Sequence, residues 1–204
     1  MVRAAALVSG DGVKLQSILD SMYFGEIPNF ELVAVISTSK NANALKRAEN
    51  ANVPAYVVDP DLFPTNTSYS MAIANKLKDM DVELVIIAGY TPELGVIPYQ
   101  YKHRIIGTYP SLIPVFSDVE DGNIFRAAIE RGIKITGATA YFADNDGCVG
   151  HIILQKPVFV EEGDTPETLA RRIMEQGEWK LLPEAVKLYC QGKLKIHGNR
   201  VVIE

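Results

Sequence analysis

Two glycines flank an aspartate in Ser9-Gly10-Asp11-Gly12, between the first apolar segment and a helix-like pattern. Glycines in such a turn let backbone amides approach a phosphate group, and the N-terminus of the next helix favours an anion. We therefore expect a phosphate-binding turn, to which Lys14 adds a positive charge. The alternative is a strand-to-helix turn without a ligand, because Leu15 replaces the third glycine of the dinucleotide-binding motif. The residues expected in this ligand-binding turn are Gly10, Asp11, Gly12, Val13 and Lys14.

Acidic, thiol and imidazole groups gather in residues 144–151, which contain Asp144, Asp146, Cys148 and His151. Such a set can bind a metal ion or move protons. The chain has only three histidines and no second cluster of this kind, so we predict an exposed acidic turn and no metal site. A further alternative makes Cys148 a nucleophile with His151 as its base.

Two other segments are rigid or aromatic. Tyr109-Pro110-Ser111-Leu112-Ile113-Pro114 carries two prolines, which predict a fixed loop after a strand. Within a long helical pattern near the C-terminus, Glu178 lies at a polar position from which it can reach a ligand hydroxyl. Trp179 is expected to line a pocket or the core, and Pro183 is expected to kink the helix.

The elements that must position these residues alternate along the first half of the chain. Strands are predicted at 4–8, 32–36, 55–58 and 84–88, and helices at 15–22, 41–51 and 67–80. Continuously apolar strands are typical of parallel sheets covered on both faces. This order predicts an α/β fold with a doubly wound, mainly parallel sheet, in one domain spanning 1–204. Ligands of such sheets bind at the carboxyl ends of the strands.

The second half of the chain follows another pattern. We expect a helix at 123–130, two longer strands at 135–142 and 152–160, one long helix at 164–192, and a hairpin at 193–203 with Gly198 near its turn. The alternation of the two longer strands suggests that another subunit covers the sheet edge, so a homodimer is expected.

Composition narrows the function classes. The net charge of -5 and the lack of a basic stripe argue against nucleic-acid binding. Two cysteines in 204 residues do not make a disulfide framework. No apolar run approaches the ~20 residues that span a bilayer, and the N-terminus does not resemble a secretory signal. We therefore expect a cytoplasmic protein whose partner is a small molecule.

In their order and spacing, these segments resemble the folate-dependent formyltransferases over nearly the whole chain. The family's Ser-Gly-x-Gly-Ser-Asn-Leu-Gln motif corresponds to residues 9–16, and its Leu-Ala-Gly-Phe/Tyr motif to residues 87–90. Its Asn-Ile-His-Pro-Ser-Leu-Leu-Pro motif corresponds to residues 107–114, and its Glu-His-x-x-Tyr/Leu-Pro motif to residues 178–183.

The resemblance implies formyl transfer from 10-formyltetrahydrofolate to an amine through a tetrahedral intermediate. In the family, an asparagine and a histidine stabilise the oxyanion, and an aspartate orients the histidine. It also implies that the glycine turn and Glu178 bind a phosphorylated substrate. The positions implied for folate binding are Gly89, Tyr90, Thr91, Pro92 and Asp144.

All three catalytic positions are substituted in this chain. Gly107 stands at the asparagine position, Tyr109 at the histidine position and Cys148 at the aspartate position, with Asp146 or Asp144 as replacements for the last. Losing one oxyanion donor typically costs about 10²–10³ in rate. We therefore expect an impaired or inactive relative that binds a ligand or regulates one-carbon or purine metabolism. The alternative is active transfer to glycinamide ribonucleotide or a related amine with a substituted catalytic set.

Overall fold

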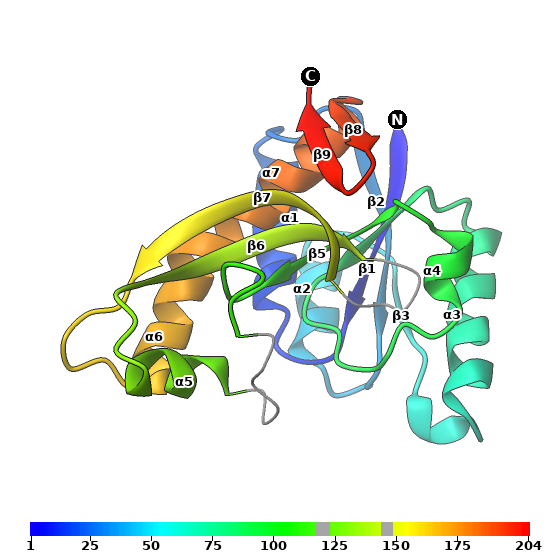
Figure 1. Ribbon diagram of the computed structural model, residues 1–204. Helices are drawn as coiled ribbons and strands as arrows, with labels where there is room; N and C mark the ends of the chain where they lie inside the picture. The colour runs from blue at the N-terminus through cyan, green and yellow to red at the C-terminus, as the bar shows by residue number, and fades with distance from the viewer. Residues whose placement is uncertain (117–122, 144–148) are drawn as a thin grey trace.

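The strands form one seven-stranded sheet in the order β3-β2-β1-β4-β5-β6-β7 (Figure 1). The computed structural model describes residues 1–116, 123–143 and 149–204. The sheet consists of β1 (Val2–Val8), β2 (Phe30–Ser37), β3 (Ala55–Val57), β4 (Leu84–Ile87), β5 (Ile105–Tyr109), β6 (Ile135–Ala143) and β7 (Val149–Phe159). The first five strands are parallel, whereas β6 is antiparallel to both β5 and β7. The predicted doubly wound, mainly parallel sheet is confirmed.

Two hydrophobic cores explain why the inner strands are apolar without alternation. In β1, Ala4, Ala6 and Val8 pack into one core, and Ala5 and Leu7 pack into the other. Successive side chains of a strand point to opposite faces, so a strand between two cores must be apolar at every position.

The first core lies under α1 (Val13–Tyr23), α2 (Asn43–Asn50), α5 (Ile124–Glu130) and the C-terminal helices. The second lies under α3 (Asn66–Asp79) and α4 (Ile97–Gln100), with the short 3-10 helix Pro60–Leu62 preceding α3. Thr65 caps helix α3 and forms a capping box with Ser68. Most predicted helix bounds are confirmed to within a few residues.

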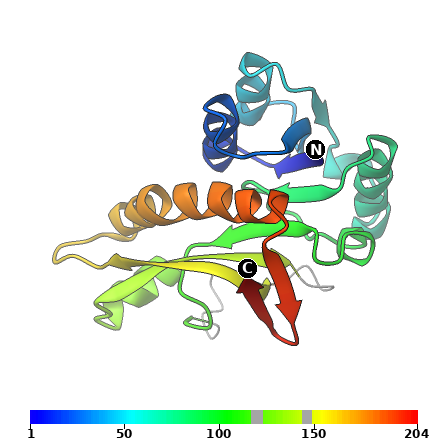
Figure 2. The same ribbon diagram turned by 90° about the horizontal axis from the view of Figure 1, so that it is seen from above.

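The predicted long C-terminal helix differs from the expectation at one point. It consists of α6 (Pro166–Ile173), a π-helical turn at Met174–Glu178 that we call the π turn, and α7 (Trp179–Cys190). The interruption lies before Pro183, which sits inside α7. Proline lacks the N–H that would donate to the carbonyl of Trp179, so this part of the helix is already weakened where the π turn joins it. Figure 2 shows α7 running between α1 and strands β6 and β7.

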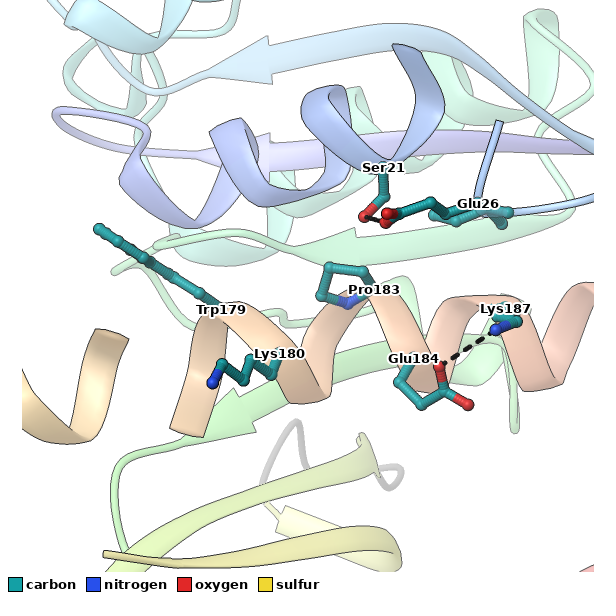
Figure 3. A pocket seen from close by; sticks show the side chains of 8 residues that line it. Ser21, Glu26, Trp179, Lys180, Pro183, Glu184 and Lys187 are labelled. Carbon is teal, nitrogen blue, oxygen red and sulfur yellow. Dashed lines mark hydrogen bonds and ion pairs between the residues drawn. The ribbon is translucent and has the colours of Figure 1, made fainter. Parts of the chain in front are cut away.

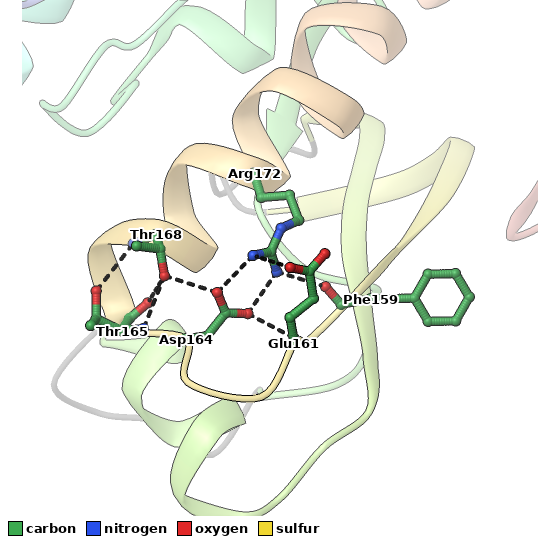
Figure 4. A network of polar contacts seen from close by, with 6 residues as sticks. All are labelled: Phe159, Glu161, Asp164, Thr165, Thr168 and Arg172. Atoms are coloured by element: carbon green, nitrogen blue, oxygen red, sulfur yellow. Dashed lines mark hydrogen bonds and ion pairs between the residues drawn. The ribbon is translucent and has the colours of Figure 1, made fainter.

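The start of α6 is fixed by a polar network centred on Asp164 (Figure 4). Thr165 caps the helix and forms a capping box with Thr168, and Pro166 occupies the first turn. The Asp164 carboxylate accepts two hydrogen bonds from Arg172, at 2.6 and 2.7 Å, and one from Thr168 at 2.9 Å. The guanidinium of Arg172 lowers the pKa of Asp164 to about 2. Glu161 also contacts Arg172, at 3.1 Å.

The predicted C-terminal hairpin is confirmed as β8 (Leu194–His197) and β9 (Arg200–Ile203), with Gly198 in its turn. It lies against β7, where His151 Nε2 is 3.0 Å from the Gly198 carbonyl oxygen. Among the residues that the structure describes, none of the helices has the length and apolar character needed to cross a membrane.

Candidate active site

The carboxyl ends of β1 and β4 are tied together at the predicted ligand edge. The Ser9 backbone N–H donates to the Gly89 carbonyl at 2.9 Å, and the Thr91 N–H donates to Ser9 Oγ at 3.0 Å. Gly89 has a φ of 88°, and nothing lies within 4 Å of the position that a Cβ would take. The strand end is therefore open on that side, next to the segment expected to bind folate.

The glycine turn is held in shape by α2. Gly12 has a φ of 70°, and a Cβ there would lie 2.7 Å from the Cα and Cβ of Ala44. The Gly10 carbonyl accepts the Ala44 N–H at 3.2 Å, and the Asp11 carbonyl accepts Nε–H of Arg47 at 2.7 Å. The N-terminus of α1 has no side-chain cap at Gly12, which leaves its first amides for another acceptor. Glycine is needed here for both its φ and its size.

A buried carboxylate joins α1, β5 and the π turn. Glu178 is 4% exposed, and its Oε1 lies 2.5 Å from Lys14 Nζ and accepts a hydrogen bond from Thr108 Oγ1 at 2.8 Å. An ammonium and a hydroxyl thus compensate the buried negative charge. The structure therefore brings together Lys14 and Glu178, which the sequence placed in the same substrate half. Sequence reasoning missed Thr108, although it lies between two predicted site residues.

A tyrosine fills the space beside Gly107. The register pairs Gly107 of β5 with Tyr141 of β6. A Cβ at Gly107 would lie 3.1 Å from the Tyr141 hydroxyl oxygen and 3.3 Å from Ile87 Cβ. Tyr141 is 8% exposed. Sequence reasoning also missed this residue, because only the register of β5 against β6 reveals which side chain faces position 107.

Tyr109 lies at the end of β5, partly buried, and packs against both cores. The loop after it is anchored to the antiparallel strands. Thr139 Oγ1 donates to the Ser111 carbonyl at 2.6 Å, and the Gln155 amide donates to the Ile113 carbonyl at 3.0 Å. The Ile113–Pro114 peptide bond is cis. The predicted fixed loop is thus held by β6 and β7.

Tyr90 contributes a partly buried phenol, with its hydroxyl oxygen enclosed, to the expected folate segment. Burial raises its pKa and that of Tyr69, and the two phenols also affect each other's pKa. Neither hydroxyl has a hydrogen-bond partner of good geometry in the described part of the chain. Thr91 and Pro92, the next residues of this segment, are exposed and partly exposed. Both tyrosines stay protonated at neutral pH and remain potential donors.

Three candidate residues, Asp144, Asp146 and Cys148, lie outside the described residues. His151, proposed as a base for Cys148, contacts the hairpin turn. The centroid of its ring lies 5.1 Å from the ring centroid of His103. Burial, and then the nearby His151 and Lys102, lowers the pKa of His103. Across residues 1–116, 123–143 and 149–204, no three His, Cys, Asp or Glu side chains form a metal-binding group.

Two pockets lie beside α1 and the start of α7, one of about 480 Å³, which Figure 3 shows, and one of about 500 Å³ that Arg47 of α2 also lines. Trp179 and Ser21 line both. The prediction that Trp179 forms a pocket wall is confirmed. Cys190, at the end of α7, is buried, and burial raises the pKa of its thiol to about 12. It is therefore a packing residue rather than a reactive thiol.

Residues 2–186 match the sequence model of the formyl transferase family. The chain belongs to this family, and its fold is that of a formyltransferase. Within the family it is similar to phosphoribosylglycinamide formyltransferase. The relative from Haemophilus influenzae is 31% identical, with 100% of this chain and 94% of the relative covered. Glycinamide ribonucleotide transformylase 1 from Symbiobacterium toebii is 40% identical, with a TM-score of 0.92 over 100% of this chain and 94% of that structure.

The likeness also extends to a larger protein. The trifunctional purine biosynthetic protein adenosine-3 of Gallus gallus is 32% identical over 96% of this chain. This chain spans 19% of the length of that protein. The similarity therefore concerns one part of the trifunctional protein.

Proposed function

We propose that this chain transfers a formyl group from 10-formyltetrahydrofolate to the amine of glycinamide ribonucleotide or a related phosphorylated amine, as a cytoplasmic enzyme of purine biosynthesis. The observation that carries the proposal is the contact of Lys14 and Thr108 with the buried Glu178. An ion pair between the first helix and the π turn, with its carboxylate buried, is costly to desolvate and is better explained by ligand binding than by stability alone.

The substrate half of the proposed site uses two kinds of group. The free amides at the start of α1 and the ammonium of Lys14 bind the phosphate. The carboxylate of Glu178 accepts hydrogen bonds from ligand hydroxyls. Thr108 and Lys14 hold that carboxylate at the strand ends, so that the ligand meets it in one orientation.

The segment from Gly89 to Pro92 fits the folate donor. The open space at Gly89 lets a flat ring approach the backbone, and the Tyr90 hydroxyl oxygen is enclosed without a hydrogen-bond partner of good geometry among the described residues. When bound, the donor supplies a formyl carbon that is activated by its bond to an aryl nitrogen. The chain's own residues orient the two ligands and keep the strand ends dry.

A ligand-binding relative without turnover is the second candidate, and Gly107 favours it. Glycine offers no side-chain donor at the position where the family uses asparagine, and Tyr109 replaces the histidine. In this version the glycine turn and Glu178 still bind a phosphorylated ligand, and the chain acts as a regulator.

The test combines turnover with binding. Purified protein is mixed with 10-formyltetrahydrofolate and glycinamide ribonucleotide, and the folate product is followed by absorbance beside an active family member. Binding of glycinamide ribonucleotide is measured by calorimetry for the wild type and for Lys14→Met. Lys46→Met, on the exposed face of α2, is the control for loss of one positive charge.

The outcomes separate the two candidates. Turnover supports formyl transfer. Binding without turnover, weakened by Lys14→Met but not by Lys46→Met, supports the regulator. Neither binding nor turnover at high protein concentration would reject both.

A further inference from the structure

The missing side chain of Gly107 admits a hydroxyl group from the neighbouring strand. Tyr141 is the direct antiparallel partner of Gly107, so its side chain stands on the face to which a Cβ at 107 would point. The hydroxyl oxygen and Cζ of Tyr141 lie 3.1 and 3.2 Å from that Cβ position. The end of the tyrosine ring therefore occupies the space that a side chain at residue 107 would fill.

The same face carries a second phenol. Residues 107 and 109 of β5 point to the same side of the sheet, because side chains alternate along a strand. Tyr109 is the last residue of β5, and it pairs with Thr139 while Gly107 pairs with Tyr141. The phenols of Tyr109 and Tyr141 thus stand as diagonal neighbours at the strand end, with Ile87 of β4 beside Gly107.

Acyl transfer needs a hydrogen-bond donor beside the carbonyl oxygen of the group that is transferred. When an amine adds to a formyl group, the formyl oxygen becomes an oxyanion, and side-chain donors, tyrosine included, stabilise it best from a site that excludes water. Tyr141 is 8% exposed and is held by the second core, so its position is fixed before any ligand arrives. A fixed donor gains most because it does not reorganise during the reaction.

We propose that Tyr141 is a catalytic residue whose hydroxyl donates a hydrogen bond to the formyl oxygen in the transition state. This inference rests on the proposed formyl transfer and names the donor that this reaction requires.

The atoms, electrons and protons of this step balance with the amine, the formyl donor and water. A bond forms between the amine nitrogen and the formyl carbon, and the carbonyl π electrons move onto the oxygen that Tyr141 faces. When those electrons return, the bond between the formyl carbon and the folate nitrogen breaks. The amine nitrogen loses one proton to water, and the folate nitrogen takes one from water. Tyr141 keeps its own proton throughout.

The experiment compares Tyr141→Phe with Tyr101→Phe in the turnover assay. Both changes remove one hydroxyl from a tyrosine buried in the same core, but Tyr101 lies at the end of α4, away from the strand ends. For Tyr141→Phe we expect kcat to fall by about 10²–10³-fold, as for other oxyanion donors, with little change in KM. Tyr101→Phe should keep kcat within about two-fold, and thermal melts should show that both variants fold.

A second readout does not depend on turnover. Tyrosine labelled with ¹³C at Cζ gives a signal for Tyr141 that is assigned by its loss in Tyr141→Phe. We expect this signal to shift when 10-formyltetrahydrofolate is added without an amine, because the hydroxyl then meets the formyl oxygen.

The failures are distinct. Absence of formyl transfer by the wild type contradicts the proposed function. If the wild type is active but Tyr141→Phe leaves kcat unchanged, this inference is wrong and formyl transfer still holds. The same conclusion follows if the Tyr141 ¹³C signal does not shift when 10-formyltetrahydrofolate is added.

Discussion

Lys14 Nζ lies 2.5 Å from Glu178 Oε1, although the two residues come from α1 and from the end of the π turn, 164 positions apart. The contact links the N-terminal and C-terminal parts of the chain at the ligand edge. Such a long-range pair can contribute to stability as well as to ligand binding, and a double-mutant cycle separates the two contributions.

In that cycle, Lys14→Met should lower the free energy of unfolding by roughly 1–3 kcal/mol, because among the described residues it leaves the buried Glu178 carboxylate with Thr108 as its one partner. Combined with Glu178→Gln, the coupling energy should be about 0.5–3 kcal/mol in urea unfolding. Lys187 and Glu184 form an exposed pair at 3.5 Å on α7, and the same cycle there should give under about 0.5 kcal/mol. Equal coupling energies for the two pairs would show that burial of Glu178 does not strengthen its interaction with Lys14.

Gly12→Ala should destabilise the chain more than Gly25→Ala. Both glycines have positive φ, of 70° and 69°, so both variants pay about 1–2 kcal/mol for the left-handed backbone. Nothing lies within 4 Å of a Cβ at Gly25, whereas one at Gly12 would meet Ala44 at 2.7 Å. The crowding should add about 1–3 kcal/mol. Chemical unfolding of the two variants measures the difference, and equal losses would contradict the close packing of the turn on α2.

Asp164→Asn should remove a part of the stability that depends on pH. The pKa of Asp164 is lowered from 3.8 to about 2 in the folded chain, mainly by its hydrogen bonds with Arg172. A carboxyl group with a depressed folded pKa stabilises the fold above its unfolded pKa and loses this effect as the pH falls through its folded pKa. The wild type should therefore exceed the variant by roughly 1.5–3 kcal/mol at neutral pH.

The gap between wild type and Asp164→Asn should shrink as the pH falls from about 4 to about 2, which urea unfolding at several pH values can follow. Glu161→Gln is the matched control, because Glu161 contacts the same guanidinium with its side chain 65% exposed. Its effect should stay under about 1 kcal/mol. A gap for Asp164→Asn that does not change with pH would mean that the charge of Asp164 plays no part.

Local patterns were enough to predict the sheet and most of its helices. Apolar runs such as residues 84–88 identified buried strands, and the helical pattern expected from residue 164 located the start of α6. The π turn was not predictable in this way, because its one unusual residue for a helix, Gly177, indicates a weaker helix without indicating a widened turn. One tertiary contact lies there: a Cβ at Gly177 would be 2.7 Å from Ala138 Cβ, so the turn packs closely on β6.

The candidate site was predictable only where it is contiguous in sequence. The glycine turn and the segment from Gly89 to Pro92 stand directly after strands, where ligands of parallel sheets bind. Thr108 and Tyr141 were missed because their roles depend on pairing across strands and across helices. Strand register is set by the whole sheet, and a single sequence does not reveal which side chain faces position 107.

The π turn at Met174–Glu178 also bears on how this chain can vary in length. A helix widened in this way holds one surplus residue, and removing that residue restores an ordinary α-helix. In a regular α-helix, deletion of one residue would rotate all later side chains by about 100°. After a deletion within the π turn, we expect α7 to keep its faces toward α1 and β5. Glu178 ends the turn directly before α7, so we expect a deletion earlier in the turn to keep its carboxylate beside α7, whereas deletion of Glu178 itself removes the carboxylate from the strand ends.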